Sequence, residues 1–327
     1  MPNVLIGSGP IRNQPGPFRD RLIAAGLTPV DMPGHLPLSG ADYRTILPEI
    51  DAVLAGGEPL SAESIAVAPR LRAIARTGVG YDSIDLAAAR ARKIAVTITP
   101  GTNQESVAEQ AFGLILGVMR RIARNDRILR AGGWDRELVP PLRGKTLGLV
   151  GLGRIGQAMV PRGVAFQMKI VAYEPIPNPE FDAKWGIRRV TMRELLAESD
   201  IVSLHLPLTT QTHGLFHREV FSLMKSGAFF INTSRGGLVI EDDLYEALTS
   251  GHLRGAGLDV FDPEPPSPAN PLLHLPNVVS SPHVGGVDAK AMEDMATLAA
   301  QCVIDLFQGR WPHECVVNPE VAEGWSW

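Results

Sequence analysis

The sequence predicts an α/β protein with two domains, and three observations support this prediction. Short apolar runs alternate with helical patterns along most of the chain, which is typical of parallel sheets covered by helices. A glycine-rich turn, Gly151-x-Gly153-x-x-Gly156, lies mid-chain between an apolar run and a helical pattern, as in dinucleotide-binding βαβ units. With 327 residues, the chain is longer than a single hydrophobic core usually spans. We therefore expect a Rossmann dinucleotide-binding domain inserted into a flavodoxin-like α/β substrate domain.

The first hundred residues alternate apolar runs with helical patterns in the order expected of a parallel sheet. The expected strands are Val4–Ile6, Ala52–Ala55, Leu71–Ala75 and Ile94–Ile98. The expected helices are Phe18–Ala25, Ala41–Ile50, Ala62–Ala68 and Ile84–Arg92. Glycines and prolines separate these elements.

A long helical pattern, from Asn103 to about Ala131, leads to the nucleotide-binding part. The strands expected there are Leu147–Val150, Lys169–Tyr173, Ile201–Leu204, Phe229–Thr233, Ala256–Val260 and Val278–Ser280, and the helices are Gln157–Phe166, Met192–Glu198, Arg218–Lys225 and Glu241–Ser250. A last helix at about 287–307 should return the chain to the first domain, so that the two long helices bridge the domains. The expected boundaries are 1–100 with 288–327 for the substrate domain, and 101–287 for the dinucleotide-binding domain.

The three glycines of the turn have different roles in a dinucleotide site. Gly151 makes the tight turn, Gly153 lets the backbone approach a pyrophosphate, and Gly156 lets the following helix pack on the strand. The unpaired N–H groups of that helix then face the phosphates. Glu174 lies 18 residues after Gly156, where an acid binds the adenosine ribose. Its charge repels a 2′-phosphate and the next residues, 175–177, offer no arginine, so we expect NAD rather than NADP. The alternative is a glycine turn in another βαβ unit, with Glu174 merely solvated.

The composition is that of an ordinary globular protein and argues against several classes. Hydrophobic residues make up 45% of the chain, and the net charge of −4 comes without a basic tract for nucleic acid. No apolar run is long enough to span a membrane, and the N-terminus opens into a strand rather than a signal peptide. Cys302 and Cys315 have neither metal-ligand spacing nor a disulfide framework, so we expect no metal and a cytoplasmic location.

Ionisable side chains follow three of the expected strands where each one ends. Arg235 follows one strand, Asp259 and Glu264 follow the next, and His283 follows the last. Because ligands of open α/β sheets bind at the carboxyl ends of strands, we expect these groups to meet at the nucleotide site. Arginine can bind carboxylate and carbonyl oxygens, and histidine can exchange a proton with the carbonyl as hydride moves to or from carbon. Glutamate beside histidine would favour the protonated ring and hold one tautomer. The pattern indicates hydride transfer between a nicotinamide and a 2-hydroxy or 2-oxo acid.

Each of these side chains also has a plainer interpretation. Arg235 could be a surface arginine, Glu264 a solvated residue of a proline-rich loop, and His283 a core histidine. His205, at the end of another expected strand, fits a structural residue or a wall of the cofactor site better than a second acid/base.

Six motifs in order resemble those of the D-isomer-specific 2-hydroxyacid dehydrogenases, the family of phosphoglycerate dehydrogenase, glyoxylate reductase, D-lactate dehydrogenase and formate dehydrogenase. The motifs are Arg76–Asp82 (RTGVGYD), Asn103–Glu109 (NQESVAE), Gly151–Gly156 (GLGRIG), Asn232–Gly237 (NTSRGG), Asp259–Phe261 with Glu264-Pro265, and Ser281–Gly286 (SPHVGG). The resemblance covers nearly the whole chain, and six ordered motifs are far more specific than one.

The resemblance implies a catalytic triad of Arg235, Glu264 and His283, with His283 as the acid/base. The implied substrate-binding residues are Val79 and Gly80, through their backbone N–H groups, with Asn103, Arg235 and His283. The implied NAD-binding residues are Gly151, Gly153, Arg154, Ile155, Gly156, Glu174, His205, Leu206, Pro207, Thr212, Thr233, Ser234, Arg235, Asp259, His283, Gly285 and Gly286. Glu174 stands where the family more often has aspartate, which lengthens the reach and keeps the charge.

The particular hydroxy acid is less determined. The Arg76–Asp82 and Thr233–Gly237 runs look most like phosphoglycerate dehydrogenases in a short form without the regulatory domain. The first expectation is therefore D-3-phosphoglycerate, with Arg12, Arg19 and Arg76 as candidates for its phosphate. The alternatives are glyoxylate or hydroxypyruvate reduction and a non-enzymatic NAD-sensing scaffold like the C-terminal-binding-protein corepressors. The resemblance also implies a homodimer built through the nucleotide domains.

Overall fold

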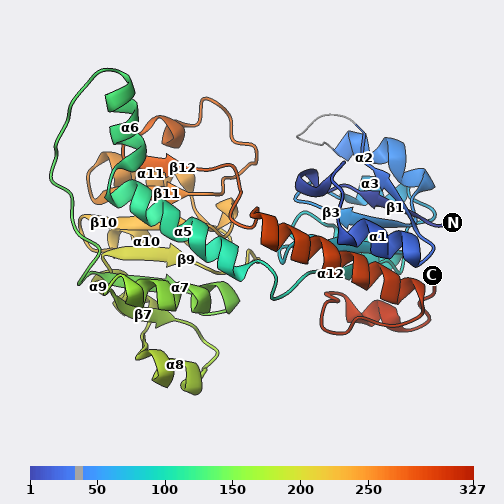
Figure 1. The fold of residues 1–327 in the computed structure, drawn as a ribbon. Helices are drawn as coiled ribbons and strands as arrows, with labels where there is room; N and C mark the ends of the chain where they lie inside the picture. The colour runs from blue at the N-terminus through green and yellow to red at the C-terminus, as the bar shows by residue number, and fades with distance from the viewer. Residues whose placement is uncertain (34–39) are drawn as a thin grey trace. The chain divides into compact units, whose positions relative to one another are not determined.

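The computed structural model describes residues 1–33 and 40–327, and the chain divides into two compact units (Figure 1). Met1–Asn103 with Gly286–Trp327 form the first unit, and Gln104–Gly285 form the second. The chain leaves the first unit once and returns to it once, so the second unit is an insertion in the first. The α/β class predicted from the alternation of apolar runs and helical patterns is confirmed.

The first unit is built on a parallel sheet of order β2-β1-β3-β4-β5, the strand order of flavodoxin-like sheets. Its strands are β1 (Asn3–Ile6), β2 (Thr28–Asp31), β3 (Ala52–Ala55), β4 (Ala73–Arg76) and β5 (Ala95–Thr97). Its helices are α1 (Pro17–Ala24), α2 (Gly40–Ile46), α3 (Ala62–Ala66), α4 (Leu86–Ala91) and α12 (Ala289–Phe307). Helices α1 and α12 contribute to one apolar core, and α2, α3 and α4 contribute to another.

Strand β2 is not among the predicted strands, because Thr-Pro-Val-Asp contains no apolar run. It pairs only with β1 at the edge of the sheet, and all four of its residues are half-buried. Proline is tolerated in an edge strand, because its missing N–H does not remove a hydrogen bond from the interior of the sheet.

The second unit is built on a parallel sheet of order β12-β11-β10-β9-β6-β7-β8. Counted from β6, this is the Rossmann order 3-2-1-4-5-6 with one more strand. Its strands are β6 (Thr146–Val150), β7 (Lys169–Tyr173), β8 (Arg188–Arg189), β9 (Ile201–Leu204), β10 (Ala228–Asn232), β11 (Leu253–Leu258) and β12 (Val278–Ser280). Its helices are α5 (Gln104–Met119), α6 (Ile122–Arg130), α7 (Arg154–Ala165), α8 (Pro179–Trp185), α9 (Met192–Glu198), α10 (Arg218–Ser222) and α11 (Glu241–Thr249). The strand order reverses between β6 and β9, which is the point where such sheets bind ligands.

The single long helix expected at 103–131 is wrong. The structure has two helices, α5 and α6, separated at Arg121, whose φ of 56° is left-handed. The apolar stripe that holds α5 in the core ends at Met119, and α6 buries none of its residues. Ile122, expected to continue the stripe, is 56% exposed. Helical spacing alone therefore did not reveal where core contact stops.

The expectation that the two long helices bridge the domains is also wrong. Helix α5 packs against α7, β10 and β11 of the second unit, and α12 packs against α1, β3 and β4 of the first. The chain passes between the units at Asn103/Gln104 and Gly285/Gly286 instead.

None of the described helices is long and apolar enough to cross a bilayer.

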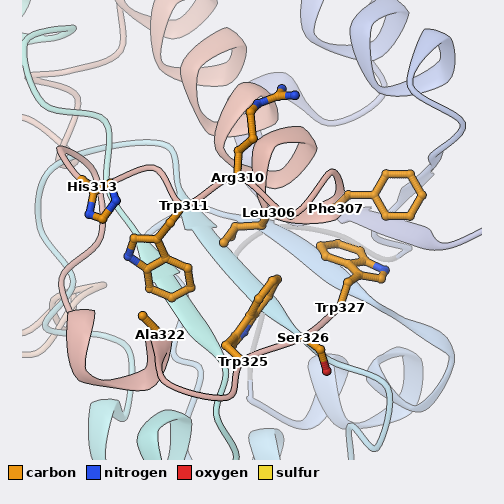
Figure 2. Close-up of a pocket in the computed structure, with 10 residues that line it drawn as sticks. Leu306, Phe307, Arg310, Trp311, His313, Ala322, Trp325, Ser326 and Trp327 are labelled. Carbon is orange, nitrogen blue, oxygen red and sulfur yellow. The ribbon is translucent and has the colours of Figure 1, made fainter.

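The last residues of the chain complete the first unit. Asn318 is fully buried; its Oδ1 accepts from the Val96 N–H at 2.9 Å and its Nδ2 donates to the Ile94 carbonyl at 2.9 Å. Trp325 then packs edge-on against Trp311, with ring centroids 5.7 Å apart (Figure 2). The C-terminal segment is thus fixed to β5 by hydrogen bonds and to the end of α12 by aromatic contacts.

Candidate active site

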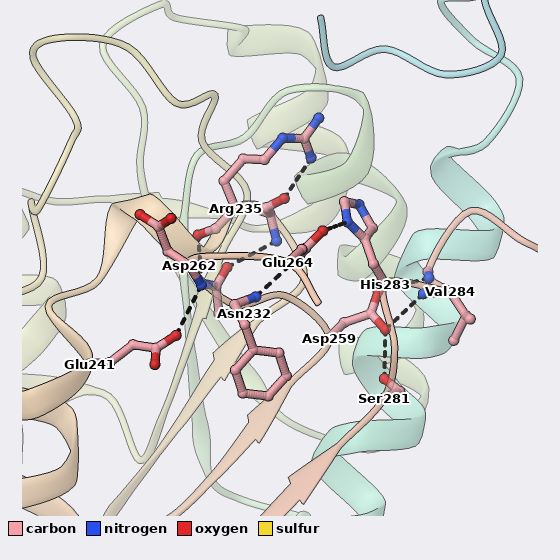
Figure 3. Close-up of polar contacts among 12 residues, drawn as sticks. Asn232, Arg235, Glu241, Asp259, Asp262, Glu264, Ser281, His283 and Val284 are labelled. Carbon is pink, nitrogen blue, oxygen red and sulfur yellow. Dashed lines mark hydrogen bonds and ion pairs between the residues drawn. The ribbon is translucent and has the colours of Figure 1, made fainter. Parts of the chain in front are cut away.

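His283 lies on the turn after β12, and the carboxylate of Asp259 holds that turn (Figure 3). Asp259 is 1% exposed; its Oδ1 accepts from Ser281 Oγ at 2.6 Å and from the Val284 N–H at 3.0 Å, and its Oδ2 accepts from the Gly285 N–H at 2.8 Å. The His283 N–H donates to the Asp259 carbonyl at 2.7 Å. His283 has a left-handed φ of 53°, which is uncommon outside glycine, so these bonds hold a backbone shape that the residue itself disfavours.

Helix α5 holds the same turn from a second direction. Ser106 Oγ donates to the Gly285 carbonyl at 2.8 Å, and Gln110 Nε2 donates to Ser281 Oγ at 2.8 Å. The two side chains are four residues apart and so lie on one face of the helix. Neither was predicted as part of the site. The available signal was a pair of polar residues at this spacing within an otherwise apolar helix face.

Glu264 and His283 form a direct pair. His283 Nδ1 lies 2.7 Å from Glu264 Oε2, and the other oxygen, Oε1, accepts from the Phe261 N–H at 3.1 Å. Because an ionised carboxylate only accepts, Nδ1 carries the proton in this pair. Nε2 is then the ring atom left to exchange a proton with a ligand, and it has no hydrogen-bond partner among the described residues. The His283 side chain is 42% exposed, so a ligand can reach it.

Arg235 follows β10, and the glycine after it brings its loop against the Glu264 loop. A Cβ on Gly236 would lie 2.0 Å from the Phe261 carbonyl, so a side chain is excluded there. Asn232 Nδ2 donates to the Arg235 carbonyl at 2.8 Å, and Arg235 Nη1 donates to the Ser234 carbonyl at 2.6 Å. The backbone carrying Arg235 is therefore fixed beside the segment that carries Glu264.

Glu241, at the start of α11, braces the Glu264 loop from its far side. Its Oε1 accepts from the Asp262 N–H at 3.0 Å (Figure 3). Its Oε2 accepts from Asn270 Nδ2 at 2.6 Å. This residue was also missed, because nothing in its local sequence relates it to partners 21 and 29 residues later.

In the glycine turn after β6, Gly153 has space for a side chain, whereas Gly151 and Gly156 do not. A Cβ on Gly151, which has a φ of 99°, would lie 2.4 Å from the His205 carbonyl oxygen, and one on Gly156 would lie 2.3 Å from the Gly151 carbonyl oxygen. Gly153, the N-cap of α7, meets nothing within 4 Å. The protein's own packing thus requires Gly151 and Gly156, whereas Gly153 leaves open space at a helix N-terminus, where a phosphate binds well.

Glu174 lies at the end of β7 and contacts the glycine turn. Its carboxylate accepts from the Leu152 N–H at 2.9 Å and from the Ile176 N–H at 3.0 Å. Arg189 of β8 donates to the Glu174 and Ile176 carbonyls at 3.0 and 2.7 Å and pairs with Asp182. The residues next to Glu174 in sequence contain no arginine. The fold nevertheless brings Arg189 beside Glu174 from β8, and Arg189 is already paired with Asp182.

Two buried polar atoms without partners lie beside the glycine turn. His205 Nδ1 and Thr233 Oγ1 have no hydrogen-bond partner among the described residues. They follow β9 and β10, which pair Leu204 with Asn232, so the two residues come next in register. Desolvation by the surrounding protein lowers the pKa of His205 to about 3, so its ring is neutral. Buried polar atoms are rarely left unbonded, and these two, with the open Gly153, fit a bound dinucleotide.

The remaining predicted cofactor residues lie at several places in the fold. Arg154 and Ile155 begin α7, and Ser234 Oγ donates to the Leu204 carbonyl at 2.7 Å. Leu206, Pro207 and Thr212 lie in the loop after β9, where Thr212 Oγ1 donates to the Pro207 carbonyl at 2.7 Å. Gly285 and Asp259 form the turn that carries His283, so the structure gives Asp259 a supporting role in which both of its oxygens are used. Gly286 belongs to the first unit and lies beside Asn103, whose Nδ2 would be 3.3 Å from a Cβ on it.

The predicted carboxylate-binding loop lies in the first unit, after β4. The backbone N–H groups of Val79 and Gly80 have no acceptor among the described residues, and both residues are half-buried. They are therefore open to an anionic ligand.

Comparison with known proteins agrees with this geometry. The family model described as D-isomer specific 2-hydroxyacid dehydrogenase, NAD binding domain, matches residues 112–285. A glyoxylate reductase of Korarchaeum cryptofilum is 41% identical over 81% of this chain and 82% of its own length. A D-3-phosphoglycerate dehydrogenase of Archaeoglobus fulgidus is 39% identical over 84% of this chain, which spans about half (53%) of that relative's length.

Solved structures give the same assignment. The D-lactate dehydrogenase of Aquifex aeolicus, complexed with NAD and lactic acid, superposes with a TM-score of 0.82 at 29% identity, covering 96% of this chain and 99% of the other. The chain therefore belongs to the D-isomer specific 2-hydroxyacid dehydrogenases, a family of NAD-dependent oxidoreductases, and its NAD-binding domain lies in the second unit.

Proposed function

We propose that this protein reduces small, unphosphorylated 2-oxo acids to D-2-hydroxy acids with NADH, and catalyses the reverse oxidation. The observation that carries the proposal is the pair of His283 Nδ1 and Glu264 Oε2 at 2.7 Å, on a turn held by a buried carboxylate. A histidine held in this way has one ring nitrogen fixed and the other free to exchange a proton, as acid/base catalysis requires.

In the direction of reduction, protonated His283 donates its Nε2 proton to the carbonyl oxygen of the substrate. Glu264 stabilises the imidazolium before that transfer and keeps the proton on Nδ1 after it. Arg235 binds the carboxylate and carbonyl oxygens and orients the carbonyl carbon. NADH, when bound, supplies the hydride to that carbon. The N–H groups of Val79 and Gly80, in the first unit, are the proposed donors to the substrate carboxylate.

The substrate preference follows from the arginines of the first unit. Arg19 pairs with Asp31 and also donates to the Gln14 carbonyl at 2.6 Å. Burial raises the pKa of Asp31, but bonds from Arg19 and Asn13 outweigh it, so the pKa lies below its usual range and the acid stays charged. Arg19 is thus neutralised by an ionised neighbour, which weakens it as a phosphate ligand.

Arg76 is similarly engaged. Its guanidinium is buried and donates to the carbonyls of Gly80 and Ala55 at 2.7 and 3.2 Å. We therefore favour glyoxylate or hydroxypyruvate as substrate. D-3-phosphoglycerate is the second candidate, supported by Arg12, whose contact with the Met32 carbonyl is long, at 3.4 Å.

NADH oxidation with matched 2-oxo acids tests the substrate class. Because Arg19 and Arg76 are engaged and Arg12 alone of the three candidates is left for a phosphate, we expect kcat/KM for glyoxylate and hydroxypyruvate to exceed that for 3-phosphohydroxypyruvate by about tenfold or more. Hydroxypyruvate and its 3-phosphate differ only in the phosphate, so each controls for the other. A preference for the phosphate ester would support phosphoglycerate instead, and no turnover with any acid would favour an NAD-sensing scaffold.

We also propose a homodimer built through the second unit. Helix α6 and the segment after it expose large apolar side chains, with Ile122 56%, Leu129 60%, Trp134 81% and Leu138 91% exposed. Ion pairs of Arg121 with Glu137 and of Arg124 with Asp135 hold that segment to α6. Exposed apolar groups gathered on one element and its neighbour are typical of an interface.

Charge placed on this surface should separate the subunits. We expect light scattering after gel filtration to give twice the chain mass for wild type and the chain mass for the double variant Trp134→Asp, Leu138→Asp, because an interface core does not accept unpaired carboxylates. Ile176→Asp, at another exposed apolar side chain of the same unit (74%), is the control and should stay dimeric. A monomeric wild type, or a double variant that keeps the dimer mass, would contradict the proposed interface.

A further inference from the structure

The loop Thr77–Gly80 offers two backbone N–H groups that the proposed function assigns to the substrate carboxylate, and the present inference rests on that assignment. Backbone donors bind an anion strongly only when the chain holds them in a fixed direction before the ligand arrives. Such a loop therefore needs side chains that fix its peptide planes. Two residues do this: Thr99 after β5, which no site assignment has included, and Arg76 at the end of β4.

Thr99 makes three hydrogen bonds to one glycine. Its Oγ1 accepts from the Gly78 N–H at 2.9 Å and donates to the Gly78 carbonyl at 3.2 Å, and its own N–H donates to that carbonyl at 3.0 Å. Thr99 is completely buried, so water does not compete for these bonds. A hydroxyl that donates and accepts at the same residue fixes both the position and the rotation of that residue.

The direction of the Val79 N–H follows from this contact. The Gly78 carbonyl and the Val79 N–H belong to one planar peptide, which is trans, so they point in opposite directions. Because Thr99 binds the carbonyl from one side, the Val79 N–H points away from Thr99, to the side where no acceptor lies among the described residues. Thr99 thus determines the direction of the Val79 N–H without bonding to it.

Arg76 fixes the other end of the loop. Its Nε donates to the Gly80 carbonyl at 2.7 Å, and its Nη1 donates to the Ala55 carbonyl at the end of β3 at 3.2 Å. The peptide before Val79 and the peptide after Gly80 are both tied to the sheet, and the Gly80 N–H lies in the peptide between them. Because Arg76 also bonds to the end of β3, its replacement would disturb more than the loop. Thr99 is therefore the better position to test.

We propose that Thr99 is a positioning residue for the carboxylate-binding loop, and that its hydroxyl aims the Val79 N–H at the substrate. The substrate feature recognised here is the carboxylate common to all 2-oxo acids. Loss of the hydroxyl should therefore weaken binding of every 2-oxo acid and of unreactive analogues, and should leave proton exchange at His283 and NADH binding in the second unit unchanged.

The test compares Thr99→Val with Thr99→Ser in the intact enzyme. We expect Thr99→Val to raise KM for glyoxylate, and the inhibition constant of oxamate, by about 10- to 100-fold, since one charge-assisted bond is misdirected. The value of kcat should change much less than KM. Thr99→Ser retains the hydroxyl and should restore both constants to near the wild-type values, and the dissociation constant of NADH should stay the same in all variants.

Thr97→Val is the matched control, because Thr97 is similarly buried (2% exposed) and lies two residues earlier, whereas the side-chain bonds to Gly78 come from Thr99. It should leave KM for glyoxylate unchanged. An unchanged KM and oxamate constant in Thr99→Val, an increase shared by Thr99→Ser, or a fall in kcat alone would each overturn the inference.

If Thr99→Val does not fold, the wild-type enzyme supplies a second measurement. Addition of oxamate to the NADH complex should shift the amide NMR resonances of Val79 and Gly80, and resonances that stay in place at saturation would overturn the inference. Failure of the proposed function is distinguishable, because it would appear as full turnover in His283→Ala or as no turnover in wild type, whatever Thr99 does to oxamate binding.

Discussion

Replacement of His283 by alanine is expected to lower kcat for 2-oxo acid reduction by about 10²- to 10⁴-fold, the contribution typical of a positioned acid/base. The physical reason is that the carbonyl oxygen gains negative charge as hydride reaches carbon, and the Nε2 proton neutralises it. Water in the vacated space is a weaker and unoriented acid. Steady-state NADH oxidation with saturating glyoxylate measures the effect.

The dissociation constant of NADH should change little in His283→Ala, because His283 is one of many implied NAD-binding residues and the glycine turn and the atoms beside it lie on other strands. His313→Ala, at an exposed histidine of the first unit, is the control and should have wild-type kcat. The kcat of Glu264→Gln should fall between those of His283→Ala and His313→Ala. An amide oxygen still accepts from Nδ1 but does not stabilise the imidazolium by charge. Turnover in His283→Ala within a few-fold of wild type, on the scale of ordinary side-chain effects, would remove His283 from the chemistry.

Replacement of Asp259 by alanine is expected to lower the free energy of unfolding by about 2–4 kcal/mol and to reduce kcat as well. The carboxylate accepts from Ser281 Oγ and from the N–H groups of Val284 and Gly285, and its loss leaves these buried or half-buried donors without that acceptor. The same bonds keep His283 in its left-handed backbone conformation, so the imidazole would lose its fixed place beside Glu264. Urea unfolding and steady-state kinetics on one preparation measure both effects.

Asp262→Ala is the matched control for this prediction. Asp262 is exposed, lies three residues further along the same segment, and takes part in the loop through its backbone N–H, which the substitution keeps. It should have near wild-type stability and kcat. An Asp259→Ala enzyme as stable and active as wild type would mean that Ser106 and Gln110 hold the turn without Asp259.

The parts of the fold and site that could be predicted are those written in local sequence. Strands β3, β7, β9 and β12 consist mainly of apolar residues, and their bounds agree with the expected ones. The glycine turn and the residues that end strands could be placed together because parallel strands end at one edge of a sheet. That rule is enough to put Glu264 and His283 in one place, and the structure pairs them at 2.7 Å.

The supporting residues could not be predicted, because their partners are distant in sequence. Asp259 bonds residues more than twenty positions later, and Ser106 bonds Gly285 across most of the second unit. Arg189, a cation beside Glu174, comes from β8, a strand too short and too polar to be recognised in the sequence. The break at Arg121 has the same origin, since only tertiary packing shows where α5 leaves the core.

The most direct test of the central claim is the product of hydroxypyruvate reduction, identified by chiral analysis as NADH is consumed. Wild-type enzyme is expected to form D-glycerate in equal amount to the NADH oxidised, and His283→Ala is expected to form almost none. Formation of L-glycerate, or absence of NADH oxidation with every 2-oxo acid tried, would contradict the assignment of Arg235, Glu264 and His283 to D-2-hydroxy acid chemistry.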